Sequence, residues 1–191
     1  MNAATGTTLG ILAGGRASRL GGRDKAWLER DGVPLVVALA RRLAPEADAV
    51  LASANADPER YAAHGLRAVP DRVAGIGPLG GLDALAHACA TQWLLTVPVD
   101  VVSVNDGLLR SLRAAAGNGG AFAEDDDGPQ PLVALWRVAA LREALAPALA
   151  SGDHAVHALQ ARLGMARARF AGMRFGNLNT PADLAAAGVD D

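Results

Sequence analysis

Short apolar runs alternate with longer segments of helical periodicity along this chain. The apolar runs predict buried strands at residues 9–13, 49–52, 66–69 and 93–97. The periodic segments predict helices at residues 35–43, 82–90, 105–116, 139–149 and 155–163. Strands that alternate with helices favour an α/β fold, in which helices flank a mainly parallel sheet.

Several residues between these segments predict where helices begin. Pro34 suits the start of the first long helix, because proline is tolerated at the first helical position. Asn105 or Asp106 is expected to cap the helix that follows it. Thr180 followed by Pro181 predicts the N-terminus of a short last helix.

The pattern of the C-terminal half and of one glycine-rich stretch predicts further elements. Two strands at residues 121–123 and 131–136 are expected to be joined by a solvated acidic turn at 124–127. Another strand is expected at 170–175. The stretch at 75–81 predicts a second glycine-rich loop that precedes a helix.

Length and hydrophobicity predict a globular chain. It has 191 residues, of which 51% are hydrophobic, so it can bury a core of its own, and we expect one domain over residues 1–191. We find no apolar run of the roughly 18 residues that span a bilayer and no signal-peptide pattern. We therefore expect no membrane partner and a cytoplasmic location.

The charge balance argues against a nucleic-acid partner. The chain carries 18 Lys and Arg against 20 Asp and Glu, which gives a net charge of −2. Any anion must then be bound by locally placed cations. Cys89 is the one cysteine, so the sequence allows no intrachain disulfide and no all-cysteine metal site, and we expect it to be buried.

The loop after the first predicted strand is the strongest candidate for chemistry. Its glycines and cations are Gly14, Gly15, Gly21, Gly22, Arg16, Arg19 and Lys25. Glycine lets backbone N–H groups approach a ligand, and successive N–H groups can cradle an anion. The Walker and dinucleotide spacings are both absent. The loop is therefore expected to bind phosphate in another way, and the alternative is an ordinary glycine-rich turn.

Three charged residues are candidates for catalysis. Asp100 directly follows the most apolar strand, where a carboxylate can hold Mg²⁺ together with phosphate oxygens, although a turn or helix cap is the alternative. Lys25 and Arg19 would place positive charge against phosphate. As alternatives, Lys25 could pair with Asp24 at the surface, and Arg19 could form a salt bridge.

Further polar and glycine positions are candidates for substrate binding. Asp71 could accept hydrogen bonds from guanine or a ribose hydroxyl, and Gly80 and Gly81 could let a planar ring approach the backbone; turn chemistry is the alternative for all three. Asn177 and Asn179 fall on one face of an extended segment. There they could contact the metal, or the acceptor, which is the second substrate that would receive the group transferred from a nucleotide.

The loop reads L-A-G-G-x-x-x-R-x-G-G-x-D-K and resembles the signature of the nucleotidyltransferases, most of all that of the molybdenum cofactor guanylyltransferases. Further matching motifs follow in order over nearly the whole chain, at residues 31–35, 54–55, 70–71, 77–81, 98–100, 130–135 and 177–181. The resemblance implies a Rossmann-like domain that uses GTP and Mg²⁺. It also implies transfer of GMP to the terminal phosphate of molybdopterin, with release of pyrophosphate.

The resemblance also assigns roles to residues. It implies that GTP binds at Leu12, Ala13, Gly14, Gly15, Ser53, Lys25, Asp71 and Asp100, with Asp100 also holding Mg²⁺. The chain departs from the family pattern at Ser53, where Asn is common, at Val102, and at Gln130 and Leu132. Proteins that deliver molybdopterin or mature molybdoenzymes are the implied partners.

Other functions stay open at this point. The same chemistry could serve a cytidylyltransferase acting on the same pterin, or a sugar-phosphate nucleotidyltransferase. The departures at Ser53, Val102 and Gln130 also fit a paralogue that binds nucleotide without catalysis. Parallel assays with GTP and CTP would distinguish a guanylyltransferase from a cytidylyltransferase. Nucleotide binding without pyrophosphate release would identify the paralogue without catalysis.

Overall fold

A seven-stranded sheet forms the centre of the computed structural model, which describes residues 4–14, 16–17, 23–152 and 154–190. The strand order is β11-β9-β10-β8-β1-β6-β7, and β10 alone runs antiparallel to its neighbours. The strands are β1 (Ala4–Leu12), β6 (Ala49–Ser53), β7 (Arg67–Val69), β8 (Thr91–Pro98), β9 (Gly120–Asp125), β10 (Gly128–Arg137) and β11 (Ala166–Arg169). The predicted α/β fold with a mainly parallel sheet is confirmed.

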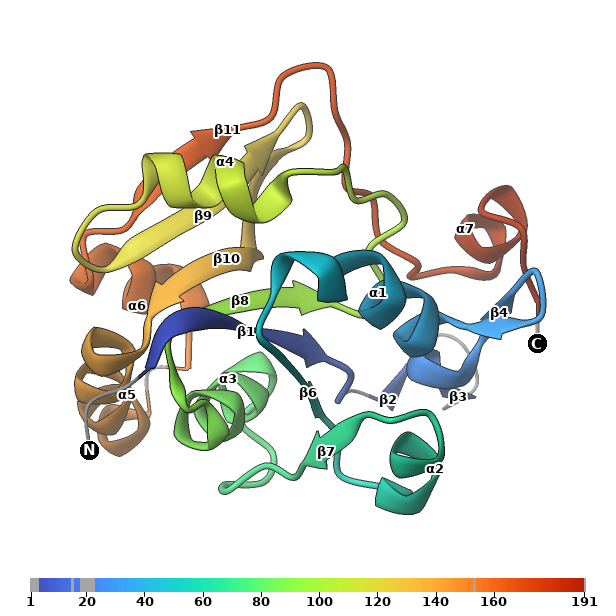
Figure 1. The fold of residues 1–191 in the computed structure, drawn as a ribbon, viewed down its shortest axis with the longest axis horizontal. Coiled ribbons are helices and arrows are strands. Elements are labelled where there is room, and N and C mark those ends of the chain that lie inside the picture. The colour runs from blue at the N-terminus through green and yellow to red at the C-terminus, as the bar shows by residue number, and fades with distance from the viewer. Residues whose placement is uncertain (1–3, 15, 18–22, 153, 191) are drawn as a thin grey trace.

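Helices cover both faces of this sheet (Figure 1). They are α1 (Leu35–Leu43), α2 (Pro58–Ala63), α3 (Pro78–Ala88), α4 (Leu108–Ala115), α5 (Val138–Ser151), α6 (Val156–Arg162) and α7 (Pro181–Ala186). One core cluster packs α1 and α4 on one face, and a second packs α3, α5 and α6 on the other. The side chains of β8 alternate between the two clusters, because successive strand residues point to opposite faces.

Short elements lie toward the C-terminal edge of the parallel strands. They are β2 (Arg16–Ala17), β3 (Arg23–Asp24), β4 (Glu29–Arg30), β5 (Val33–Pro34), β12 (Val189–Asp190) and the 3₁₀ turn η2 (Lys25–Trp27). A second 3₁₀ turn, η3 (Ala44–Glu46), connects α1 to the start of β6. In Figure 1 the arrows of β1 and β8 both point toward β4 and α7. The C-terminal segment therefore closes over the edge at which these strands end.

Two helix starts differ from the prediction. α3 begins at Pro78, so the second glycine-rich stretch ends four residues earlier than expected and Gly80 and Gly81 are helical. α4 begins after Gly107, and neither Asn105 nor Asp106 provides a side-chain cap. Asp106 instead pairs with Arg42 at 3.0 Å, while Glu46 accepts hydrogen bonds from the backbone at the start of α4.

The expected strand at residues 170–175 is wrong. Residues 171–172 form a turn, with Gly172 at φ 72°, and the strand lies earlier, as β11, with the sequence Ala-Arg-Ala-Arg. The aromatic residues Phe170 and Phe175 pack against each other with ring centroids 5.4 Å apart. Their hydrophobicity therefore marks the core rather than a strand.

The expectations for Cys89 and for Thr180 are confirmed. Cys89 is buried and free, and Thr180 caps α7 as expected, in a full capping box. In the part of the chain that the structure describes, no helix is both long and apolar enough to cross a membrane.

Candidate active site at the ends of β1, β6 and β8

The register of three parallel strands brings their C-terminal ends together. Leu12 of β1 pairs with Ser53 of β6 on one side and with Pro98 of β8 on the other. Just beyond the strands, Ala13 N donates to Ser53 O at 3.1 Å and Val99 N donates to Leu12 O at 3.1 Å. Ligands of open α/β sheets bind at this edge. The edge therefore places the start of the glycine loop between the residues that follow β6 and β8.

Lys25, Asp100 and Asn179 meet at this edge from three distant parts of the sequence. Lys25 Nζ donates to Asp100 Oδ2 at 2.8 Å and to Asn179 Oδ1 at 3.0 Å. The side chains of Lys25 and Asp100 are 15% and 20% exposed, so the ion pair lies at the surface of the site and not in the core. The alternative for Lys25, a surface pair with Asp24, is not what the structure shows, since Lys25 pairs with Asp100 and Asp24 accepts from Ala26 N.

The backbone around Asp100 is fixed by the C-terminal segment. Leu178 N donates to Asp100 O at 3.0 Å, and Val102 N and Ser103 N both donate to Phe175 O at 3.0 Å. Leu178 is buried between two exposed asparagines, which confirms that Asn177 and Asn179 share one face. Of the two, Asn179 bonds to Lys25, and Asn177 forms a β-bridge with Val101.

The capping box of α7 holds Asn179 in place. Asp183 Oδ2 accepts from Asn179 N at 3.0 Å and from Thr180 N at 2.7 Å, and Asp183 N donates to Thr180 Oγ1. The hydrogen bond with the Thr180 side chain, followed by the two backbone bonds, lowers the pKa of Asp183, and the charge of Lys25 acts in the same direction. α7 therefore positions the amide that Lys25 contacts.

The acidic run at residues 124–127 is only partly a solvated turn, because Glu124 and Asp125 belong to β9 and Asp125 is fully buried. Its carboxylate accepts from Phe175 N at 2.7 Å, from Asp127 N at 3.0 Å and from Gln130 Nε2 at 3.2 Å. Burial acts to raise the pKa of Asp125, but these hydrogen bonds together lower it. Gln130, a departure from the family pattern, thus helps to fix the segment that supports the Asp100 loop.

Asp71 and Asn55 form a reciprocal pair beside the glycine loop. Asn55 Nδ2 donates to Asp71 Oδ2 at 2.9 Å, and Asp71 N donates to Asn55 Oδ1 at 2.7 Å. Asp71 Oδ1 is shielded from solvent and has no hydrogen-bond partner among the described residues. Asp71 is a predicted site residue, whereas Asn55 is not, although residues 54–55 are among the motifs that match the family.

Close packing accounts for the small residues at three of the predicted binding positions, Ser53, Gly80 and Gly81. Ser53 is 1% exposed, and a Cβ on Gly81 would collide with its hydroxyl. A Cβ on Gly80 would lie 3.2 Å from Asp71 Oδ2. The two glycines let α3 pack closely against β6 and Asp71, and acceptor binding by Gly80 and Gly81 stays a prediction.

The predicted loop residues divide by exposure. The side chains of Leu12 and Ala13 are buried, and their Leu12 O and Ala13 N atoms already bond to neighbouring strands, whereas Gly14 is exposed. Gly15 and Arg19 lie outside the described residues. Of Leu12, Ala13 and Gly14, Gly14 is therefore the residue that is open to a ligand.

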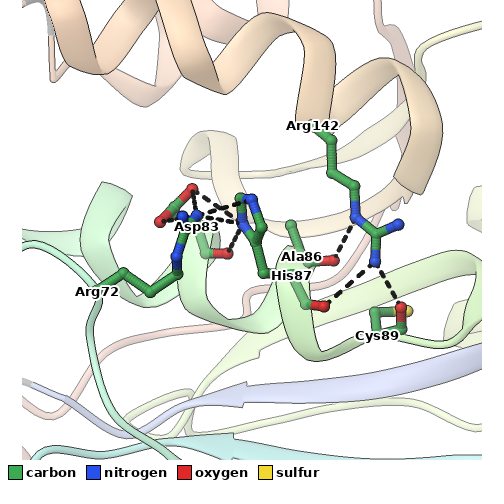
Figure 2. Close-up of polar contacts among 6 residues, drawn as sticks. All are labelled: Arg72, Asp83, Ala86, His87, Cys89 and Arg142. Carbon is green, nitrogen blue, oxygen red and sulfur yellow. Dashed lines mark hydrogen bonds and ion pairs between the residues drawn. The ribbon is translucent and has the colours of Figure 1, made fainter.

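A second charged cluster joins α3 to Arg72, the residue after Asp71, and combines a buried carboxylate with two exposed side chains. Asp83 is 1% exposed and accepts from Arg72 Nη1 at 3.1 and 3.3 Å, while His87 Nδ1 lies 3.2 Å from Asp83 Oδ1. Figure 2 shows Arg72 reaching toward Asp83 and His87, while Arg142 of α5 contacts the carbonyl groups at the end of α3. These contacts fix the start of the loop that carries Asp71.

The donor atoms at the sheet edge suit Mg²⁺. The Asp100 carboxylate and the Asn179 amide oxygen both lie within 3.0 Å of one positive charge, the Lys25 ammonium. Mg²⁺ takes oxygen ligands, and one or two carboxylates with phosphate oxygens and water suffice to bind it. The described residues contain no group of three or more His, Cys, Asp or Glu that would bind a metal alone. Asp100 is thus suited to sharing a metal with a phosphorylated substrate.

Comparison with known proteins gives consistent results. A family model described as the MobA-like NTP transferase domain matches residues 9–167. A protein of Cereibacter sphaeroides named molybdenum cofactor guanylyltransferase is 42% identical over 181 residues, which cover 93% of this chain and 93% of that protein.

Two solved structures have the same fold. Molybdopterin-guanine dinucleotide biosynthesis protein A from Archaeoglobus fulgidus superposes with a TM-score of 0.72 at 20% identity, covering 95% of this chain and 96% of that one. 2-C-methyl-D-erythritol 4-phosphate cytidylyltransferase from Thermus thermophilus gives a TM-score of 0.68 at 22% identity, covering 94% and 96%. These identities show the fold alone, whereas the family match and the Cereibacter relative identify the chain as a member of the MobA-like NTP transferase domain family.

Proposed function

We propose that this protein transfers GMP from GTP to the terminal phosphate of molybdopterin and releases pyrophosphate. The observation that carries the proposal is the meeting of Lys25, Asp100 and Asn179 beside the exposed Gly14, in a chain 42% identical to a named guanylyltransferase. A cation, a carboxylate and an amide at the edge of a parallel sheet suit the binding of a nucleoside triphosphate.

The residues at the edge act mainly by positioning and by neutralising charge. The acceptor phosphate is already anionic, so it needs little help from a general base to attack the α-phosphorus in line. Lys25 would place its ammonium against the phosphate oxygens as negative charge shifts toward the departing pyrophosphate. Gly14 leaves room for the triphosphate, and Arg19 is a further predicted contact.

Asp100 is the residue that would hold Mg²⁺, with Asn179 beside it. When bound, the metal supplies positive charge that offsets the charge on the α-phosphate and on the leaving pyrophosphate. Asp100 suits this role because its carboxylate is 20% exposed and its backbone is fixed by Leu178. Lys25, which pairs with Asp100 at 2.8 Å, would place its charge against the triphosphate.

Other residues around the sheet edge would contribute to substrate binding. Leu12, Ala13 and Gly15 are proposed to line the nucleotide through their backbone, and Gly81 and Asn177 to lie near the acceptor. We also propose that the chain works as one domain in the cytoplasm, where proteins that deliver molybdopterin or mature molybdoenzymes would meet it.

Pyrophosphate release tests the proposal directly. The purified protein is incubated with Mg²⁺, molybdopterin and either GTP or CTP. Release with GTP alone supports the proposal, whereas release with CTP alone would reverse the base assignment and leave the mechanism standing. Nucleotide binding without release under either condition would identify a paralogue without this activity.

A further inference from the structure

A cavity of about 300 Å³ lies between α1 and the segment that leads from β8 to α4. Helix and segment run side by side on one face of the sheet (Figure 1). Val99 and Val101 line the cavity, whereas Asp100, which lies between them in the sequence, does not, and neither do Lys25 and Asn179. The cavity is therefore distinct from the cluster at the sheet edge, although it touches the segment that carries Asp100.

Most of the cavity wall is apolar. Leu35, Ala38 and Leu39 line it from α1, because residues three and four apart share one face of a helix. Val101 and Val104 line it from the segment after β8. A concave, apolar wall of this size favours an apolar group over water, and its volume lies at the lower end of the range for small-molecule sites.

Two arginines give the remaining wall a positive charge. Within the described residues, the Arg30 side chain makes one hydrogen bond, from Nη1 to Val102 O at 3.4 Å, and its Nε is shielded from solvent without a partner. Arg42 contacts Val104 O at 3.4 Å and pairs with Asp106 at 3.0 Å.

The contacts of these arginines are weak enough to be exchanged for a ligand. The side chains of Arg42 and Asp106 are 50% and 86% exposed, and an ion pair that is open to solvent contributes little. Arg30 pairs with no carboxylate among the described residues. Both guanidinium groups reach carbonyl groups that lie two residues apart, so they can approach the same anion.

We propose that this cavity is a second ligand site, and that it takes a small amphipathic carboxylate. The apolar body of the ligand packs against Leu35, Leu39 and Val101, and its carboxylate accepts hydrogen bonds from Arg30 and Arg42. The volume is that of about ten water molecules, which leaves room for about ten non-hydrogen atoms, the size of octanoate. The ligand then lies against the segment that holds Asp100. The inference goes beyond the proposed function, because it concerns a ligand that is neither GTP nor molybdopterin.

Calorimetric titration of the whole protein with octanoate, without nucleotide, tests the charge requirement. Octanoate should bind once per chain with a Kd of about 1 mM or below. Octylammonium and octan-1-ol carry the same apolar body without the negative charge, and they should bind at least about 5-fold more weakly. Arg30→Gln should weaken octanoate binding about 3- to 10-fold, because it removes one charged donor group.

A filled cavity tests the location. Ala38→Phe places a ring in the cavity and keeps both arginines, so octanoate affinity should fall more than about 10-fold. Ala146→Phe is the matched control, because Ala146 is an exposed alanine of α5, and it should bind octanoate like the unmodified protein. The thermal midpoint of each variant shows that it is folded. Lys25→Gln should leave octanoate affinity within about 2-fold, since Lys25 does not line the cavity.

Four results would overturn the proposal. They are no binding at about 5 mM octanoate, equal binding of octanoate and octylammonium, normal octanoate affinity in folded Ala38→Phe, and a larger loss in Lys25→Gln than in Arg30→Gln. The last result would place octanoate at the sheet edge. Because the titrations contain no nucleotide, a protein that fails to release pyrophosphate from GTP would overturn the proposed function and leave this inference standing.

Discussion

Two clusters in this protein pair a carboxylate with a cation, and they differ in what surrounds them. Asp100 meets Lys25 at the edge of the sheet with 20% of its side chain exposed. Asp83 meets Arg72 under α3 with 2% of its side chain exposed, and His87 lies against the same carboxylate. The first pair is held by loops after β1 and β8, and the second by a helix and the loop before it.

The two carboxylates differ in whether their hydrogen-bond partners can be replaced by a ligand. Asp83 has both oxygens engaged by Arg72 and can gain nothing from a ligand, because it is buried. Asp100 has one bonded oxygen and faces the site, so its ammonium partner can be replaced by a metal or moved to a phosphate. Ion pairing in itself therefore says little about function, whereas exposure and the number of fixed partners separate a ligand site from a structural contact.

The largest effect on activity is expected at Asp100. Asp100→Asn removes the charge and keeps the shape, so turnover should fall about 10²- to 10³-fold while the thermal midpoint stays within a few degrees. Steady-state pyrophosphate release and thermal unfolding provide the measurements, with Glu143→Gln on the exposed side of α5 as the matched control. Turnover near that of the unmodified protein would show that Asp100 is as structural as Asp83.

At Arg72 we expect a loss of stability, whereas at Asp100 we expect a loss of turnover. Arg72→Ala leaves the buried Asp83 carboxylate with His87 as its remaining described partner. Because the Arg72 side chain is 51% exposed, solvent screens the pair, and the loss of unfolding free energy should be about 1 to 2 kcal/mol. Arg162→Ala, at an exposed arginine of α6, should change stability by less than about 0.5 kcal/mol. Denaturant titration measures both variants, and a matching loss in the two would remove the distinction between the clusters.

Asp125 lies between the two cases, since it is buried like Asp83 but supports the segment that holds Asp100. Its pKa is lowered in the folded protein, so its carboxylate stabilises the fold fully above the unfolded value of about 4. That contribution is lost as the pH falls through the lower folded pKa. Unfolding free energy measured from pH 6 to pH 2.5 should therefore decline at the acidic end, and Asp125→Asn should flatten that part of the profile.

Local signals in the sequence were enough to predict that a candidate site lies at the C-terminal edge of β1 and β8. The glycines lie within a few residues of the apolar strand β1, and the Asp100 carboxylate lies two residues after the apolar strand β8. Their meeting follows from the parallel run of the two strands. β11 was missed because its arginines alternate with alanines and make its pattern polar. Burial of Asp125 could not be read from a run of four acidic residues that look alike.

Two of the pairings that the sequence did not predict illustrate its dependence on tertiary contacts. Asn55 meets Asp71 across two strands, and Asp83 meets Arg72 because Gly77 and Pro78 turn the chain into α3. A weak signal existed for Asp83, which is the one charged residue in an otherwise apolar helical stretch. Such a residue is rarely buried without a partner, so a paired role could have been expected.

The smallest effect is expected at Thr180, and it tests how far the site depends on α7. Thr180→Ala removes the cap and should lower the free energy of unfolding by about 1 kcal/mol, while Thr180→Ser should restore most of that loss. Because the same capping box holds the backbone of Asn179, turnover by Thr180→Ala should also fall by a small factor and recover with serine. Unfolding titrations and pyrophosphate release on the same samples measure the two effects. A loss of stability with full turnover would mean that Lys25 and Asp100 hold Asn179 without help from the helix, and the site would then be more independent of its scaffold than the Asp83 cluster is.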